Sequence, residues 1–379
     1  MLEEKRWEQS GPEVPENFHK RFEETLEQIE RKPTARKWKT AYRVLAAAAA
    51  VAALGGGTVL AAGVFGWNPK AVEKWQPSDV QQEELVEAKA AQSYEEAGVT
   101  QDGVTVKLLQ TLQDERQIYM MLQVDFPEGM AFSSEYTFDQ WEVLVDGKPI
   151  TDLAEQEQSS LACGGNFVST PETDTGEVYE ALYEVNASFA KKVDLAGKEI
   201  GLVLKDLCDT EKGDVTEKLA EGSWEFSWTA EDASKIVRTF AVEQTYDFGG
   251  YEILIQKIEL SPLGYTVYAD YESAMAVEED ERNRFEYNGD DPGMELDTRL
   301  AIRGVKMKDG TVMLASTENG DAEGETGEFL AYVLGGSGMN KNQEEGTVEV
   351  YQNFSKVLDM ENVESVYLMR GDVEISLEG

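Results

Sequence analysis

Residues 44–67 form an uncharged run of 24 residues, rich in Ala and Gly, which limits the architectures open to this chain more than any other feature. At 1.5 Å of rise per helical residue, the run is long enough to cross the roughly 30 Å hydrocarbon core of a bilayer. It is the only such run in the sequence. We therefore expect one transmembrane helix over 44–67, with the rest of the chain divided between the two sides of a membrane.

The charges that flank the run predict its orientation. Basic residues are concentrated before it, and those nearest to it are Arg36, Lys37, Lys39 and Arg43. The positive-inside rule then places the N-terminus in the cytoplasm and the long C-terminal part outside the cell membrane. Tyr42 and Trp67 stand at the two ends of the run, where amphipathic rings favour the lipid headgroup layers.

Two other interpretations of the run stay open, a cleaved signal peptide and a buried helix of a soluble protein. Residues 59–61 resemble a cleavage site, although the segment before the run would be unusually long for a signal peptide. The run also carries small residues at every fourth position, which predicts close packing of two such helices in a homodimer. These residues are Ala49, Ala53, Gly57 and Ala61.

The tail of residues 1–43 is nearly neutral, with 10 Lys+Arg and 9 Asp+Glu. Within it, an amphipathic helix is predicted over about 15–32, because apolar residues recur there at helical spacing. They are Phe18, Phe22, Leu26 and Ile29. An isolated helix of this length is marginal in water, so its apolar face requires another surface. We favour docking of this face in a groove on a cytoplasmic protein. The alternatives are that the helix lies on the inner leaflet of the membrane or that the segment is disordered.

The formal net charge of the whole chain is −40, and all of the excess follows the tail: residues 44–379 carry 24 Lys+Arg and 65 Asp+Glu. Such a charge argues against direct nucleic-acid binding, which requires clustered cations. The single His19 excludes sites that need several histidines, and two cysteines exclude a four-cysteine zinc site. Cys163 and Cys208 either form one disulfide or remain two thiols.

After the run, the polar residues 68–98 are expected to form a juxtamembrane stalk. From there the apolar period changes to two, which predicts a mainly β region. A hairpin is expected over 104–126, and short strands separated by Gly and acidic turns follow it. We expect two Ig-like β-sandwich domains, over 99–232 and 233–379. The acidic stretches 278–291 and 318–327 are expected to be surface loops.

Searches for catalytic and metal motifs find no signature, so we expect neither an enzyme nor a bound cofactor or metal. The stretch Gly335-Gly336-Ser337-Gly338 lacks the last Gly of a nucleophile elbow. An EF-hand-like start at Asn319 fails because Leu330 stands where the bidentate Glu is required. Loose Ca²⁺ binding by acidic loops and a glycosidase with paired acids stay open.

The chain resembles the domain of unknown function 4179 family, single-pass membrane proteins of Gram-positive bacteria described as anti-sigma-factor-like. The residues that carry the resemblance are the tail motif 14–18, the apolar stripe, the basic Ala-rich anchor, the hairpin 104–126 and the closing stretch 357–368. The stretch 251–271 is similar to a companion C-terminal β-domain, domain of unknown function 5643.

This resemblance implies that the cytoplasmic helix sequesters a sigma factor through Phe18, Phe22, Leu26 and Ile29, while the ectodomain senses an envelope signal. The HxxxCxxC-type zinc signature of another anti-sigma class is absent. The alternative function is an extracellular binding or adhesion module that is anchored at the membrane by the same run.

Overall fold

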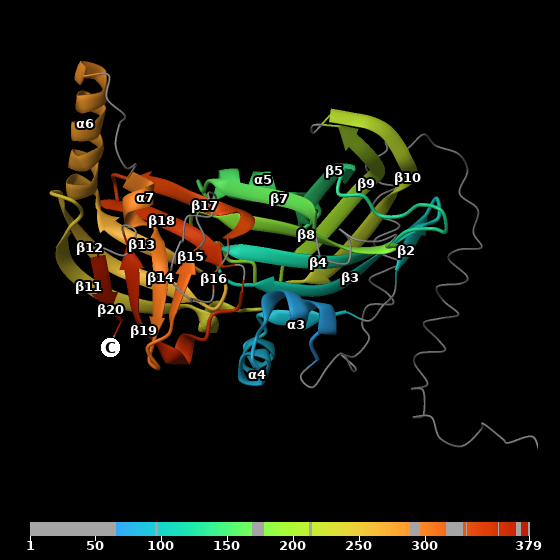
Figure 1. Ribbon diagram of the computed structural model, residues 1–379, viewed down its shortest axis with the longest axis horizontal. Helices are drawn as coiled ribbons and strands as arrows, with labels where there is room; N and C mark the ends of the chain where they lie inside the picture. The colour runs from blue at the N-terminus through green and yellow to red at the C-terminus, as the bar shows by residue number, and fades with distance from the viewer. Residues whose placement is uncertain are drawn as a thin grey trace, which may run out of the picture. The chain divides into compact units, whose positions relative to one another are not determined.

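β-Sheets make up most of the described chain, and their strands are antiparallel except for the parallel pair β15 (Val312–Ala315) and β16 (Phe329–Leu330), which confirms the mainly β prediction (Figure 1). The computed structural model describes residues 66–94, 98–168, 178–211, 214–288, 296–315, 329–330, 332–354, 356–368 and 373–377. The predicted cytoplasmic helix lies outside these residues, as does the predicted anchor apart from Gly66 and Trp67. No helix within the described ranges has the length and apolar character that crossing a bilayer requires.

The first β module consists of two sheets that we call A and B. Sheet A runs in the order β1 (Ala91–Ser93), β3 (Val104–Gln113), β4 (Gln117–Asp125), β8 (Glu180–Phe189) and β7 (Leu161–Val168), and β2 (Val99–Gln101) also pairs with β3. Sheet B runs in the order β10 (Asp214–Thr229), β9 (Glu199–Glu211), β5 (Tyr136–Val145) and β6 (Lys148–Pro149). One apolar cluster contains Ile118 of sheet A and Leu202 of sheet B, so the two sheets pack in a sandwich-like arrangement.

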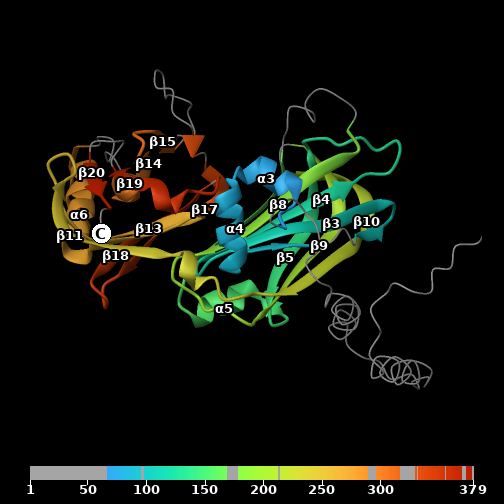
Figure 2. The same ribbon diagram turned by 90° about the horizontal axis from the view of Figure 1, so that it is seen from below.

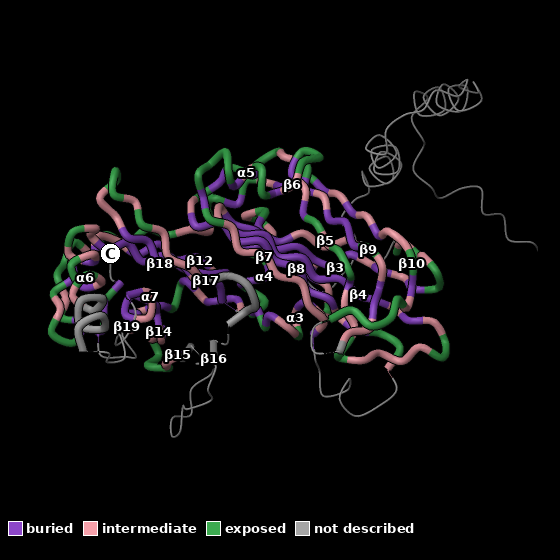
Figure 3. Tube along the Cα trace, turned by 90° about the horizontal axis from the view of Figure 1, so that it is seen from above, coloured by how far each residue is buried: buried purple, intermediate pink, exposed green. Residues whose placement is uncertain are grey.

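The second β module has the same plan, with sheets C and D. Sheet C runs in the order β11 (Arg238–Asp247), β12 (Glu252–Ser261), β13 (Gly264–Asp270), β18 (Thr347–Phe354) and β17 (Tyr332–Asn342). Sheet D runs in the order β16 (Phe329–Leu330), β15 (Val312–Ala315), β14 (Ile302–Met307), β19 (Val363–Leu368) and β20 (Val373–Ser376). A separate apolar cluster joins these sheets, and Figure 3 shows buried residues along the strands of both modules.

Period-two alternation explains why the predicted hairpin forms. In β4, Ile118 and Met120 face the core, while Tyr119 and Met121 belong to a different cluster on the other face of sheet A. The tight turn at Asp146-Gly147 joins β5 to β6, and both residues have positive φ (50° and 73°), as a type I′ turn requires.

Within the described ranges, the helices are short except for α6 (Tyr271–Asn288). The others are α3 (Pro69–Trp75), α4 (Asp79–Glu87), α5 (Ile150–Gln156) and α7 (Leu296–Leu300), with single 3₁₀ turns η1 (Ser234–Ile236) and η2 (Met360–Asn362).

Helix α6 corrects the prediction of an acidic loop over 278–291, because the helix continues to Asn288. The carboxylate of Asp270 accepts a hydrogen bond from the backbone amide of Ser273 at 2.9 Å and so caps the helix. Ala274 and Val277 are buried against the second module. Capping and this buried face outweigh the repulsion between the acidic residues. The other predicted acidic loop, 318–327, lies outside the described residues.

Residues 68–98 do not form the expected stalk. Helices α3 and α4 lie beside sheet A, and strand β1 pairs with β3 (Figures 1 and 2). The side chain of Ser78 caps α4 in a reciprocal arrangement with Gln81. The polar composition suggested solvent exposure, but Trp75 and Leu85 are buried. We call residues 66–94 the leading segment.

Candidate functional site at the junction of the two β modules

The turn between β3 and β4 carries the central residue of the junction between the modules. The carboxylate of Asp114 accepts hydrogen bonds from the backbone amides of Arg116 (2.8 Å) and Gln117 (3.1 Å). This side-chain-to-backbone pattern holds the turn in one conformation. The turn therefore presents Arg116 to sheet C of the second module, with only 15% of its side chain exposed.

Arg116 contacts acceptors from both modules. Its guanidinium donates to the carbonyl oxygen of Ala190 in the first module and to the hydroxyl of Tyr268 in the second. The Nη2 atom lies 3.5 Å from the carboxylate of Glu259, and Nη1 lies 4.0 Å from that of Glu349. The planar fork of an arginine can serve several acceptors at once, which suits this position.

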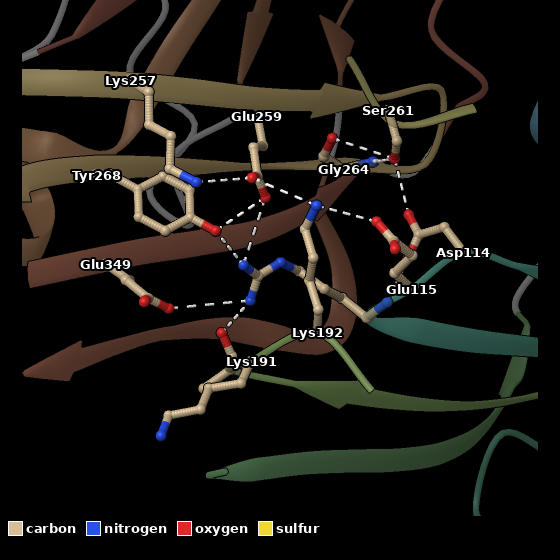
Figure 4. Close-up of polar contacts among 12 residues, drawn as sticks. Asp114, Glu115, Lys191, Lys192, Lys257, Glu259, Ser261, Gly264, Tyr268 and Glu349 are labelled. Carbon is tan, nitrogen blue, oxygen red and sulfur yellow. Dashed lines mark hydrogen bonds and ion pairs between the residues drawn. The ribbon is translucent and has the colours of Figure 1, made fainter. Parts of the chain in front are cut away.

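Glu259 of β12 is the acidic centre of the same network (Figure 4). Its carboxylate accepts hydrogen bonds from Lys257 (2.9 Å) and from the hydroxyl of Tyr268 (2.8 Å), and Lys192 lies at 3.3 Å. Burial by itself would raise the pKa of Glu259, but these hydrogen bonds and the two lysine charges lower the pKa below its ordinary value. Glu259 is therefore held as a carboxylate at neutral pH.

The pKa of Glu349 in β18 is shifted in the opposite direction from that of Glu259. Its side chain is 6% exposed, and burial raises the pKa of Glu349, although the charge of Arg116 opposes the shift. Burial also raises the pKa of the Tyr268 hydroxyl well above its ordinary range. The junction thus buries several ionisable groups, and only some of the charges are well compensated.

Hydrogen bonds between the modules extend the junction beyond Arg116. The hydroxyl of Ser261 donates to the carboxylate of Asp114 at 2.8 Å (Figure 4), and the amide of Asn353 donates to the hydroxyl of Ser188 at 2.5 Å. Gly264 of β13 lies so close to the backbone of β18 that an added Cβ would stand 2.7 Å from the carbonyl oxygen of Gln352. Only glycine fits here.

The cavity at the junction is too small for a substrate. Its volume is about 20 Å³, which is room for about one water molecule. A wider depression of about 520 Å³ opens elsewhere on the second module. It is lined by Asp247, Gly250, Tyr251, Glu252, Ser273, Ala276 and Val277. In the part of the chain that the structure describes, no group of three or more His, Cys, Asp or Glu is placed to hold a metal ion.

The leading segment is the third component of the junction. Trp75 makes edge-to-face contacts with Trp67 (6.3 Å between ring centroids) and with Tyr119 of sheet A (6.0 Å). The same apolar cluster includes Leu263 and Val357 of the second module. The leading segment therefore packs against both modules at once.

Charged residues attach α3 to strand β8. Lys70 forms an ion pair with Glu180, and Nζ of Lys74 lies 3.4 Å from the carboxylate of Glu184. Burial raises the pKa of Glu184, although Lys74 opposes this shift. The two cations that follow the predicted anchor are thus paired with protein carboxylates.

Trp67 was predicted at the headgroup layer, and the structure corrects this position. The side chain is fully buried, and its indole nitrogen donates to the carbonyl oxygen of Gln82 at 3.1 Å. A buried and hydrogen-bonded indole is not available to lipid. The other predicted membrane-flanking residues lie outside the described residues: Arg36, Lys37, Lys39, Tyr42 and Arg43.

The predicted partner-binding and helix-pairing residues also lie outside the described ranges. They are Phe18, Phe22, Leu26 and Ile29, and Ala49, Ala53, Gly57 and Ala61. The disulfide alternative is wrong, because Cys163 and Cys208 are both free thiols. Cys163 lies in β7 of sheet A and Cys208 in β9 of sheet B, so the two side chains belong to different sheets.

Sequence reasoning missed the junction itself. In the sequence, Arg116 is part of the turn of the hairpin predicted over 104–126, and Glu259 stands between Ile258 and Leu260 in a strand with ordinary alternation. One available signal was the charged triplet Asp114-Glu115-Arg116 in a turn between two strongly apolar strands. That signal marks the turn as unusual, but it does not identify the partners.

No family model and no curated protein matches this chain. Among solved structures, the chain is similar to "The crystal structure of the conserved domain protein from Bacillus anthracis". The two are 9% identical, the match covers 73% of this chain and 78% of that chain, and the TM-score is 0.39. A similarity at that TM-score carries no functional assignment.

Proposed function

We propose that the chain is a non-enzymatic, single-pass membrane regulator of the anti-sigma-factor type. In this proposal, the helix predicted over 15–32 sequesters a sigma factor in the cytoplasm, and residues 44–67 contain the anchor. Two Ig-like β-sandwich domains then respond to a signal in the cell envelope. The support from the sequence is the nearly neutral tail with its apolar stripe, the basic flank and the uncharged run.

One structural observation supports the proposal most: the last residue of the uncharged run and the residues that follow it pack against both β modules. Trp67 is buried, α3 is paired to β8, and Trp75 contacts the second module through Val357. A flexible stalk would separate the modules from the anchor. The observed packing instead links any rearrangement of the modules to the chain beside the predicted anchor.

The junction is the element that we expect to respond to the signal. Its charged groups, centred on Arg116, are strongly solvated when exposed, so the energetic difference between a closed and an open junction is small. A ligand or a change in the envelope needs only a modest differential affinity to shift such an equilibrium.

The full-length chain with a C-terminal tag, recovered from its own cells, tests the cytoplasmic function. The double substitution Phe22→Asp and Leu26→Asp places two charges in the apolar stripe. We expect it to lower the amount of co-purified sigma factor at least about tenfold, since hot-spot apolar contacts dominate helix-in-groove binding. The matched control is Lys20→Ala with Arg31→Ala, which changes the net charge equally on the opposite helix face and should leave recovery unchanged.

Equal recovery from the apolar-stripe variant, or no sigma factor with the unaltered chain, would overturn the proposal. The adhesion alternative predicts a different pattern. Deletion of residues 1–40 would then change no transcription, while the chain displayed on the cell would still bind a wall or host ligand.

A further inference from the structure

The two β modules have separate hydrophobic cores. Among the described residues, the buried members of one cluster lie within 104–230 and those of another within 248–377. The cluster that contains residues of both modules is built on the leading segment. It comprises Trp67, Ala71, Trp75, Leu85, Ala90, Ala91, Leu109, Leu112, Tyr119, Met121, Ala233, Leu263 and Val357. Residues 66–94 therefore connect apolar residues of the two modules within this cluster.

Hydrogen bonds of the leading segment also reach both modules. The amide of Val357 donates to the carbonyl oxygen of Trp75 at 3.0 Å, and the side chain of Gln81 donates to the carbonyl oxygen of Val357 at 3.2 Å. On the other side, the amide of Gln113 donates to the carbonyl oxygen of Ala90 at 2.8 Å. Release of the segment would expose all of these groups together.

The direct contact between the modules is of a different kind. It includes strand β17 beside β7 and β8 of the first module, the charged network around Arg116, and hydrogen bonds such as the one from Ser261 to Asp114. Buried ion pairs contribute little net stability, because desolvation offsets their attraction, whereas apolar burial contributes about 25 cal/mol per Å². The leading segment therefore adds apolar contact between the modules, and the charged network adds directional contacts that align them.

We infer that docking of the leading segment and closure of the junction are one coupled equilibrium. Opening of the junction weakens the docking of residues 66–94, because it removes their contacts with Leu263 and Val357 of the second module. Undocking of these residues in turn removes contacts that hold the junction closed. Such coupling is reciprocal. For its biological meaning as signal transfer, this inference rests on the proposed function, but the coupling is a property of the described residues.

Hydrogen exchange of the full-length chain in detergent micelles tests the coupling. Arg116→Met leaves Glu259 and Glu349 without their shared cation, so the junction should open more often. Exchange of the amides in α3 and β1 should become at least about tenfold faster, since removal of one partner from a buried charge network is strongly destabilising. The control Arg238→Met breaks a pair with Glu361 that is exposed and lies within the second module. It should leave residues 66–94 unchanged.

A gentler pair of variants tests the reverse direction. Val357→Ala trims a side chain that contacts the leading segment, and Val366→Ala trims an equal side chain in the core of the second module. Val357→Ala should accelerate exchange in both α3 and the turn 114–117, which Val357 does not adjoin in sequence. Val366→Ala should accelerate exchange in sheet D alone.

Faster exchange confined to the turn in Arg116→Met, or to residues near 357 in Val357→Ala, would overturn the inference. A uniform acceleration over the whole chain would overturn it too, because the segment would then not be a separate unit. Neither readout involves a sigma factor. The coupling can therefore fail while the proposed function holds, and loss of sigma-factor binding would leave the coupling intact.

Discussion

The backbone amide of Val357 donates a hydrogen bond to the carbonyl oxygen of Trp75 at 3.0 Å. The first of these residues lies near the end of the second β module, and the other ends the first described helix. Trp75 is 2% exposed and Val357 is 6% exposed, so the bond is shielded from water. The chain that follows the uncharged run is thus hydrogen-bonded to the segment between β18 and β19 of the second module.

Protection from trypsin distinguishes this arrangement from a stalk. In the native full-length chain, the bonds after Lys70 and Lys74 should resist cleavage, because both residues belong to α3 and pair with Glu180 and Glu184. We expect cleavage there to be at least about 100-fold slower than in the same chain under mild denaturant. Mass spectrometry of timed digests measures the rates. Early cleavage at these bonds would show that residues 66–94 behave as a stalk.

Glu259 should stabilise the fold at neutral pH. Its pKa is lowered in the folded state, so the stability that its carboxylate contributes is fully present above the unfolded pKa of about 4.3. That stability is lost as the pH falls through the folded pKa. We expect Glu259→Gln to cost about 2 kcal/mol at pH 7, and the difference from the unaltered chain to shrink in acid. Denaturant unfolding at several pH values measures it.

The control for this prediction is Glu361→Gln. Glu361 is also paired to an arginine, Arg238, but both side chains are exposed, so solvent screens the pair and the substitution should change stability little. An equal effect of the two substitutions would contradict a special contribution of the buried network.

The stability contribution of Glu184 should depend on pH in the opposite direction from that of Glu259. Its pKa is raised by burial, so the protonated form is favoured in the folded chain, and that stability is lost as the pH rises through the folded pKa. Glu184→Gln imitates the protonated form, and we expect it to unfold at higher denaturant concentration than the unaltered chain at pH 7. The advantage should disappear below about pH 4, where the unaltered residue is protonated in both states. A loss of stability at pH 7 would mean that the pair with Lys74 outweighs the cost of burial.

The two cysteines should react as thiols. Without any reductant, the unfolded chain should take up two alkyl groups from iodoacetamide, which mass spectrometry counts directly. In the folded chain, burial raises the pKa of Cys163 to about 11 from 9.0. At pH 8, its alkylation should therefore be about 100-fold slower than that of an exposed thiol, in proportion to the thiolate fraction. If no alkyl group is taken up until a reductant is added, the two cysteines form a disulfide and this prediction is wrong.

Local patterns predicted the strands well, but they did not predict helix α6. The hairpin over 104–126 appears as β3 and β4, because side chains alternate between two faces whatever the distant contacts are. The acidic stretch that begins at Glu278 was assigned to a loop on composition alone. It is helical to Asn288, since capping by Asp270 and burial of Val277 stabilise the helix.

The candidate site could not be predicted in the same way. Arg116 and Tyr268 are 152 positions apart in the sequence, and neither residue carries a local pattern that names the other. The polar composition of residues 68–98 likewise indicated a stalk, because composition reports average solubility and not which side chains become buried. Within this largely polar stretch, Trp75 is buried, as is Trp67 directly before the stretch, and both pack against the β modules.

The sequence by itself determined the mainly β character, the uncharged run and the separation of charge between the tail and the rest, because these depend on periodicity and counting. Only the tertiary structure decided that the segment after the run packs against both modules and that charged residues meet between them. Those contacts join residues far apart in the chain, and their energy depends on burial, which no local pattern contains.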